Sequence, residues 1–274
     1  MIITILVVLG LCFGSFVNAL VWRLYKQERS RSKSRDPKLS ILTGRSMCPK
    51  CKHELSVLDL VPVFSYIWLR GKCRYCHEAI ADSPLAELLT PALFVLSYVY
   101  WPLGFESKGL TMFVFWLVLL VGLVALALYD LKWYILPNKL TYSLLVIGCV
   151  QALLLVTIFT GRVETAWQLV GGLLIGGGLF YILFQVSKGR WIGGGDVKLG
   201  MLLGLILAQP SLAILMIFGA SFLGTLVSIP LLALGKANKN SRIPFGPFLI
   251  AGAVIARLFG LSLIAWYKRQ LGVQ

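Results

Sequence analysis

The stretch LTMFVFWLVLLVGLVALALYD (residues 110–130) carries no charged side chain until its final aspartate. A run of about 20 apolar residues is long enough to cross the hydrocarbon core of a bilayer as a helix. The whole chain has the same character, with 274 residues that are 58% hydrophobic and only 14% charged. A soluble protein of this size needs far fewer hydrophobic residues and carries more charged ones, so the sequence predicts an all-α, polytopic integral membrane protein.

Apolar runs of this kind recur along the chain, and we expect about eight transmembrane helices. The sixth run is short for a full crossing and is expected to tilt or to share a bend with the seventh. The runs cover residues 2–21, 85–101, 110–129, 140–160, 167–186, 197–208, 211–234 and 247–266.

The basic residues predict the orientation, because short loops rich in Lys and Arg remain cytoplasmic. Most of the 26 Lys and Arg residues fall in loops on one side, and the densest group lies between Arg23 and Arg74. No basic residue precedes the first apolar run, which is the pattern of an N-out anchor and not of a cleaved signal peptide. We therefore expect both termini outside and the long loop after the first helix in the cytoplasm.

The basic segment RLYKQERSRSKSRDPK (residues 23–38) directly follows the first membrane helix. A basic run is also a feature of nucleic-acid-binding tails. Because this segment directly follows a membrane helix, we interpret it as a determinant of membrane topology that lies near anionic lipid headgroups, and not as a nucleic-acid-binding tail. We therefore expect no nucleic-acid partner.

Four cysteines form two CxxC pairs in this loop, CPKC (Cys48 and Cys51) and CRYC (Cys73 and Cys76). The spacing is close to that of zinc sites in which two short knuckles supply four thiolates. A reducing cytoplasm disfavours disulfides between them. The sequence predicts a small zinc-binding module whose closed site organises the loop and leaves no open position for hydrolysis.

Two histidines follow the knuckles and are alternative ligands. His53 and His77 lie two residues and one residue after the CxxC pairs. Either could replace a cysteine or remain solvated, and four cysteines are favoured because they already complete a tetrahedral Zn²⁺ site.

Three acidic residues fall at membrane depth, namely Glu87, Asp130 and Asp196. An ionisable group there costs roughly 2.5–3.5 kcal/mol, which makes it a functional candidate. Asp130 ends the third run and Asp196 opens the sixth, so both are expected at the cytoplasmic boundary. Each also has a structural reading, because Asp196 could cap its helix and Asp130 could pair with a nearby lysine.

Together the two aspartates favour a catalytic pair. Close carboxylates share a proton, so one acts as a base on water while the other protonates the carbonyl oxygen or the leaving amine. The apolar runs contain no histidine, and the chain has no GxSxG or HExxH motif. These residues point to peptide hydrolysis by an aspartyl dyad.

Three glycines precede Asp196 in WIGGGDVKLG (residues 191–200). We expect Gly193, Gly194 and Gly195, with Lys198, to form a substrate loop along which an extended peptide lies close to exposed backbone.

The chain resembles the bacterial type IV prepilin peptidases over nearly its whole length. The resemblance is carried by GSFVNALVWRL (residues 14–24), the paired CxxC loop, PLAELLTP (residues 84–91), ALYDLKWYILPNKLT, GGGDVKLG with its GxGD motif, and IPFGPFLIAGA (residues 243–253). One departure is Asn138, where that family commonly has an aspartate. The implied organisation is a first transmembrane helix at 1–22, a basic loop with the four-cysteine module at 23–83 and a transmembrane aspartyl peptidase domain at 84–274.

The resemblance implies a membrane peptidase of the bacterial inner membrane that cleaves prepilin or pseudopilin precursors after a glycine, on the cytoplasmic side, with Asp130 and Asp196 as the dyad. It also implies methylation of the new N-terminus with S-adenosylmethionine as co-substrate. Glu87 is a candidate for methyl transfer or for holding the substrate amine, and a buried hydrogen bond is its simpler role.

Two other functions remain open at this point. One is a peptidase without methyltransferase activity, and the other is a proton-coupled transporter that uses the aspartate pair. A transporter of that type predicts internal repeats, and none is convincing in this chain. Arg257, deep in the last run, either reaches the membrane surface or pairs with a carboxylate.

Overall fold

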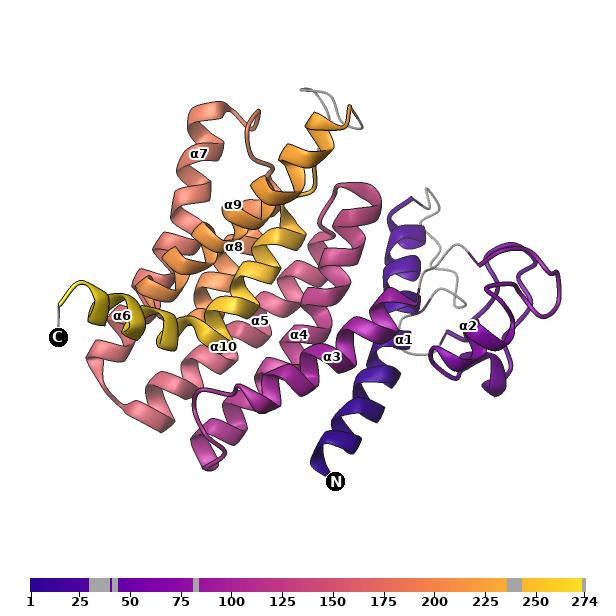
Figure 1. Ribbon diagram of the computed structural model, residues 1–274, viewed down its shortest axis with the longest axis horizontal. Helices are drawn as coiled ribbons and strands as arrows, with labels where there is room; N and C mark the ends of the chain where they lie inside the picture. The colour runs from indigo at the N-terminus through magenta and orange to yellow at the C-terminus, as the bar shows by residue number, and fades with distance from the viewer. Residues whose placement is uncertain (30–39, 41–43, 81–83, 236–242, 273–274) are drawn as a thin grey trace. The chain divides into compact units, whose positions relative to one another are not determined.

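The computed structural model describes residues 1–29, 40, 44–80, 84–235 and 243–272. Within these residues the regular structure is helical, apart from two isolated β-bridges, so the predicted fold class is confirmed (Figure 1). The elements are α1 (Ile2–Arg29), η2 (Val57–Leu60), α2 (Phe64–Trp68), α3 (Leu85–Val99), α4 (Ser107–Trp133), α5 (Asn138–Leu154), η3 (Leu155–Thr160), α6 (Val163–Leu173), η4 (Leu174–Gly178), α7 (Leu179–Ser187), α8 (Gly194–Leu207), α9 (Pro210–Ala233) and α10 (Gly246–Gln270).

Each of the eight predicted runs is helical, and six helical stretches of the described chain are long and apolar enough to cross a membrane. These are Ile2–Arg29, Ser107–Trp133, Asn138–Thr160, Val163–Ser187, Pro210–Ala233 and Gly246–Gln270. The helices α3 and α8 are shorter. The number of crossings remains a prediction.

The chain divides into two compact units. Unit 1 comprises Met1–Val99 with Leu120–Ala125, and unit 2 comprises Tyr100–Leu119 with Leu126–Gln274. The predicted domain limits at 22 and 83 remain predictions.

In unit 1, helices α1 and α3 pack closely because α1 presents glycines at the contact. A Cβ at Gly14 would lie 2.6 Å from the carbonyl oxygen of Ala86. Phe13 and Phe94 also meet across this interface, with ring centroids 6.3 Å apart. Small residues permit such close helix contacts where hydrophobic burial alone does not drive association in lipid.

In unit 2, helix α8 is the core element, with most of its residues buried. Glycines allow α8 to lie close to α6 and η4. A Cβ at Gly172 would lie 2.8 Å from the carbonyl oxygen of Gly204, and a Cβ at Gly176 would lie 2.7 Å from that of Gly200. The glycine-rich stretch 171–178 therefore serves helix packing, as its GxxxG spacing predicts. A helix covered by protein in this way need not present a full membrane-length apolar surface.

Candidate functional site

Asp130 lies near the C-terminal end of α4 and is only 6% exposed. The backbone N–H of Gly246, the first residue of α10, donates a hydrogen bond to Asp130 Oδ2 at 3.1 Å. The positive end of the α10 dipole therefore faces a carboxylate. Only glycine fits there without a shift, because a Cβ at position 246 would lie 2.6 Å from Asp130 Oδ2.

Asp196 lies in the first turn of α8 and is half-buried. Its N–H donates to the carbonyl oxygen of Gly193 at 3.1 Å, which forms the first turn. Its carboxylate lies near enough to Asp130 for their negative charges to repel. The structure therefore brings the two sequence-predicted aspartates near each other within unit 2, and their action as an aspartyl dyad remains a prediction.

The three glycines before Asp196 leave space beside it because they carry no side chains. Their backbone does not use the left-handed region that glycine also allows. None of Gly193, Gly194 and Gly195 has a positive φ, and Gly193 is extended at φ −75° and ψ 149°. A Cβ at Gly195 would come within 3.2 Å of the Leu136 side chain, whereas the other two positions have only ordinary contacts. The open space at these positions supports the predicted approach of another chain, which remains a prediction.

Lys198 pairs with a neutral partner and not with an aspartate. Its Nζ donates to Asn138 Oδ1 at 2.7 Å and lies 4.9 Å from the centroid of the Tyr142 ring. These contacts link the N-terminal part of α8 to the start of α5. In the described part of the chain no ion pair joins Lys198 to Asp130 or Asp196.

The four loop cysteines in unit 1 converge as their spacing predicts. Their Sγ atoms all lie within 4.8 Å of one another, and Cys48 and Cys76 are 3.8 Å apart. A tetrahedral ion with Zn–S bonds of about 2.3 Å separates its sulfur ligands by about 3.8 Å. All four cysteines are free, and the cluster contains neither histidine.

The two knuckles have the same backbone design. In the first, Cys48 N–H donates to the His53 carbonyl and Lys52 N–H to the Cys48 carbonyl. In the second, Cys73 N–H and His77 N–H make the equivalent bonds, to the carbonyls of Glu78 and Cys73. Lys52 and His77, each four residues after the first cysteine of its pair, have positive φ values of 58° and 56°.

The electrostatics of the first knuckle favour a thiolate. Burial disfavours ionisation of Cys48, but hydrogen bonds from the backbone N–H groups of Cys51 and Lys50 outweigh burial and lower the pKa of Cys48 to about 7. A metal ion requires the deprotonated form, so this environment suits a ligand. His53 instead contacts the ring of Tyr75 in a tilted arrangement, with ring centroids 3.7 Å apart.

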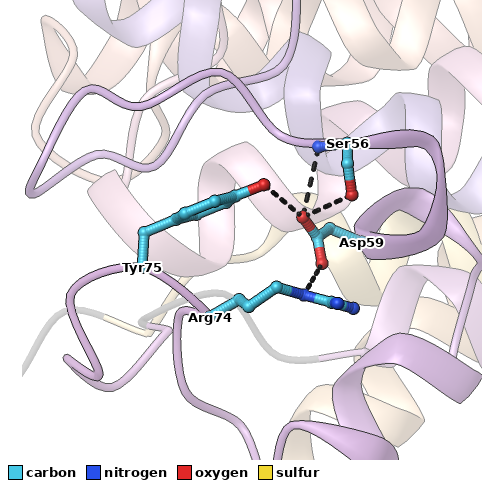
Figure 2. Close-up of polar contacts among 4 residues, drawn as sticks. All are labelled: Ser56, Asp59, Arg74 and Tyr75. Atoms are coloured by element: carbon cyan, nitrogen blue, oxygen red, sulfur yellow. Dashed lines mark hydrogen bonds and ion pairs between the residues drawn. The ribbon is translucent and has the colours of Figure 1, made fainter.

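Asp59 stabilises the second knuckle by accepting hydrogen bonds from Arg74 and Tyr75, a role that the sequence did not indicate (Figure 2). Its side chain is 3% exposed and accepts hydrogen bonds from Arg74 Nε at 2.7 Å, Ser56 Oγ at 2.8 Å, Ser56 N–H at 3.1 Å and the Tyr75 hydroxyl at 3.3 Å. Burial alone would raise the pKa of Asp59, but the bonds from Ser56 and the Arg74 charge outweigh it and lower the pKa. The Ser56-x-x-Asp59 spacing was the available signal, since it is that of a capping box.

Glu87, in the first turn of α3, holds an unusual turn in the module. Its Oε2 accepts the N–H of Val63 at 2.6 Å. Val63 has φ 62° and ψ −48°, and Phe64 N–H donates to the Pro62 carbonyl at 2.6 Å. This is a γ-turn with positive φ at its centre, which is strained and rare for a β-branched residue. Strained backbone persists where its surroundings hold it, often beside a functional site.

A half-open cavity of about 170 Å³ in unit 1 is bounded by α1, the cysteine module and the start of α3. Its walls combine aromatic rings, hydroxyl and amide groups, guanidinium groups and two carboxylates. They include Asn18, Trp22, Asp59, Tyr66, Arg74 and Glu87. Such a mixture suits an organic ligand that carries both ring and charged groups.

Comparison with known proteins finds two family matches in the chain. The family described as the bacterial peptidase A24 N-terminal domain matches residues 8–101, and the type IV leader peptidase family matches residues 117–229. The first match contains the cysteine module and Glu87, and the second contains both aspartates. No solved structure was found to match the chain.

Several curated proteins are similar over nearly the full length, each named prepilin leader peptidase/N-methyltransferase. The protein of Aeromonas salmonicida is 32% identical, with 94% of this chain and 91% of that protein covered. That of Pseudomonas aeruginosa is 31% identical, with 97% and 93% covered. The Bacillus subtilis protein is 28% identical, with 98% and 100% covered.

Proposed function

The chain belongs to the type IV leader peptidase family and is a multi-pass membrane protein, and from this premise we propose that it is a prepilin leader peptidase with N-methyltransferase activity. Asp130 and Asp196 form the catalytic dyad, which cleaves the leader of a prepilin or pseudopilin after a glycine. The observation that carries this assignment is the approach of the two carboxylates in unit 2, with the α10 N-terminus held on Asp130.

The dyad hydrolyses the peptide bond by general acid–base catalysis. The ionised carboxylate removes a proton from water as the water oxygen bonds to the scissile carbonyl carbon. The protonated carboxyl group gives its proton to the carbonyl oxygen, which yields a tetrahedral gem-diol intermediate. The carboxyl group that took the proton from water then gives it to the leaving amine nitrogen, while the other carboxylate takes back a proton from a hydroxyl of the intermediate. The C–N bond breaks, and the dyad again holds one proton.

Replacement of either aspartate tests this mechanism. Asp130→Asn and Asp196→Asn each prevent the exchange of one proton between two carboxylates, so leader removal from a prepilin should fall by at least about a thousandfold. The exposed Glu164 provides a matched control, because Glu164→Gln removes a carboxylate of unit 2 outside the dyad. Mass spectrometry of the pilin measures cleavage, and near-normal cleavage by an aspartate variant would exclude the dyad.

The cysteine cluster is proposed to hold a structural Zn²⁺ ion through Cys48, Cys51, Cys73 and Cys76. The Sγ separations, which match those of a tetrahedral ion, support this ligand set. Bound zinc would join the two knuckles, which lie 21 residues apart in sequence, and stabilise a module with little apolar core of its own. Four protein ligands leave no position at which the ion activates water.

The cavity of unit 1 is proposed to bind S-adenosylmethionine, which supplies the methyl group for the new N-terminal amine. Its aromatic, hydroxyl, carboxylate and guanidinium groups fit the adenine, ribose, ammonium and carboxylate parts of that molecule. Glu87 lines this cavity and fixes the Val63 turn, so it positions the wall and presents negative charge to a cationic ligand.

Separating the two activities tests the role of Glu87. Glu87→Gln should preserve leader cleavage and reduce methylation at least about tenfold, because a charge-assisted hydrogen bond and a carboxylate are both lost. The test measures the masses of pilin products made in the presence of S-adenosylmethionine. An unmethylated product from the unmodified protein would leave a peptidase alone, and normal methylation by Glu87→Gln would remove Glu87 from the site.

The orientation is proposed from charge. Both termini lie on the outer side of the membrane, and the zinc module and the dyad lie on the cytoplasmic side, as the concentration of basic residues between positions 23 and 74 supports. Cysteine-accessibility labelling of a residue added at each terminus, with intact and permeabilised cells, would test this orientation. Labelling at either terminus only after permeabilisation would contradict it.

A further inference from the structure

Unit 2 has a second cavity of about 170 Å³, which the peptidase mechanism does not use. It lies where α8 ends and α9 begins. Its nearest lining residue on α8, Leu205, is about 14 Å along the helix from Asp196 at 1.5 Å per residue. Its polar lining includes Lys108, Gln151, Thr165, Gln168, Gln209 and Arg257. At about 30 Å³ per water molecule, the space holds roughly six waters or a group of similar size.

Arg257 is the most unusual member of this lining. It is 9% exposed in the middle of α10, and its guanidinium carbon lies 4.8 Å from the centroid of the Trp101 ring. Its Nε has no hydrogen-bond partner, and in the described ranges no carboxylate lies within ion-pair distance. The ion pair expected as one alternative is therefore not observed among the described residues, while the approach of Arg257 to the membrane surface remains a prediction. A buried guanidinium without a counter-ion is costly.

Gln151 lines the same cavity and is also incompletely bonded. It is 5% exposed, its Oε1 has no partner, and its Nε2 lies 3.8 Å from Met112 Sδ. A thioether is only a weak acceptor. Because rotation of the amide exchanges its oxygen and nitrogen, Gln151 can present either a donor or an acceptor to a ligand.

The charge of the cavity has one sign. Lys108 is a second, half-buried cation, and the lining includes no acidic residue. Glu106 and Glu164 are exposed and outside the lining, although Glu164 Oε1 accepts a long hydrogen bond of 3.5 Å from Nε2 of the lining residue Gln168. Positive electrostatic potential therefore accumulates here without an internal counter-charge.

Helix ends reinforce this potential. Lys108, Thr165 and Gln209 belong to the starts of α4, α6 and α9, where dipoles are positive. Two C-terminal helix ends, where dipoles are negative, also border the cavity, since Leu207 ends α8 and Thr160 ends η3. The two cations and three helix starts outnumber these two ends.

We propose that this cavity binds an anion of the phosphate class, either the phosphodiester of a lipid headgroup or inorganic phosphate. Arg257 would supply the planar fork that matches phosphate oxygens, and Lys108 a second charge. Gln151 and the other polar groups of the lining complete a built site that is separate from the dyad.

Thermal unfolding of the delipidated full-length protein in detergent tests the proposal. One arm adds phosphatidylglycerol, and the other adds inorganic phosphate against chloride at equal ionic strength. The variants are Lys108→Gln and Arg257→Gln, and the matched control is Arg162→Gln, which removes an exposed cation at the start of α6. Lys108 is half-buried, so Lys108→Gln decides the matter if Arg257→Gln does not fold.

The expected result is a dose-dependent rise of the unfolding midpoint in the unmodified protein and in Arg162→Gln. The apparent affinity should be about tenfold weaker in Lys108→Gln. A response to phosphatidylglycerol alone identifies a lipid headgroup, and a response to inorganic phosphate identifies a free anion. The proposal is overturned if neither probe raises the midpoint, or if Lys108→Gln responds like Arg162→Gln.

Discussion

Gly246→Ala should impair catalysis through Asp130 without removing a catalytic group. The added Cβ would lie 2.6 Å from Asp130 Oδ2, 3.3 Å from its Cγ and 3.6 Å from Leu199 Cδ2. Carbon atoms of real side chains essentially never come within 3.0 Å of such a neighbour, so the two groups must separate by at least 0.4 Å. The hydrogen bond from the residue 246 N–H, now 3.1 Å, would lengthen to about 3.5 Å, the limit of a useful bond.

The cost follows from the charge of the acceptor. A hydrogen bond to an ionised group contributes about 1.5–3 kcal/mol, and displacement of a catalytic group by about 1 Å costs about a hundredfold in rate. We therefore expect kcat/KM for leader cleavage to fall by about 10- to 100-fold in Gly246→Ala. The assay is single-substrate cleavage of a purified prepilin followed by mass spectrometry.

Gly224→Ala is the matched control for this test. It also adds a methyl group to a membrane helix, but its Cβ would meet Phe248 at an ordinary 3.7 Å. Its cleavage rate should remain within about threefold of the unmodified protein, with an unchanged unfolding midpoint. Equal rates for Gly246→Ala and Gly224→Ala would refute the proposed coupling of α10 to Asp130.

Three further predictions concern the module and the start of α8. Asp59→Asn should destabilise the module by about 2 kcal/mol at pH 7. Because folding lowers the pKa of Asp59, this difference in stability between the variant and the unmodified protein should persist from pH 7 to pH 5 and decline only below about pH 4. Hydrogen exchange measures the stability of both proteins, and equal stabilities already at pH 5 would contradict the prediction. Cys73→Ser should abolish stoichiometric zinc measured by elemental analysis, whereas Cys149→Ser, which alters an exposed thiol on α5, should retain it. Asn138→Asp should raise the temperature midpoint of unfolding by the equivalent of about 0.5–1 kcal/mol. The substitution places a carboxylate in the first turn of α5, where it faces the ammonium group of Lys198. A lower midpoint would argue against that contact.

Features set by local sequence were predictable. The apolar run ending at Asp130 is helical in α4 because its length and composition leave no other way to satisfy backbone groups in lipid. The four-cysteine cluster was predictable because each CxxC pair forms its own knuckle with short-range hydrogen bonds.

Contacts between distant residues were decided only by the tertiary structure. The sequence placed Asp130 and Asp196 at similar depth but could not place Gly246, 116 positions away, against one of them. It likewise indicated no partner for Asp59 and left two readings of Arg257 open, of which the ion pair is not found among the described residues. Hydropathy and spacing report the environment of a residue along its own helix or loop, whereas the atoms that meet a carboxylate or a guanidinium depend on how helices pack, and similar apolar surfaces allow many packings.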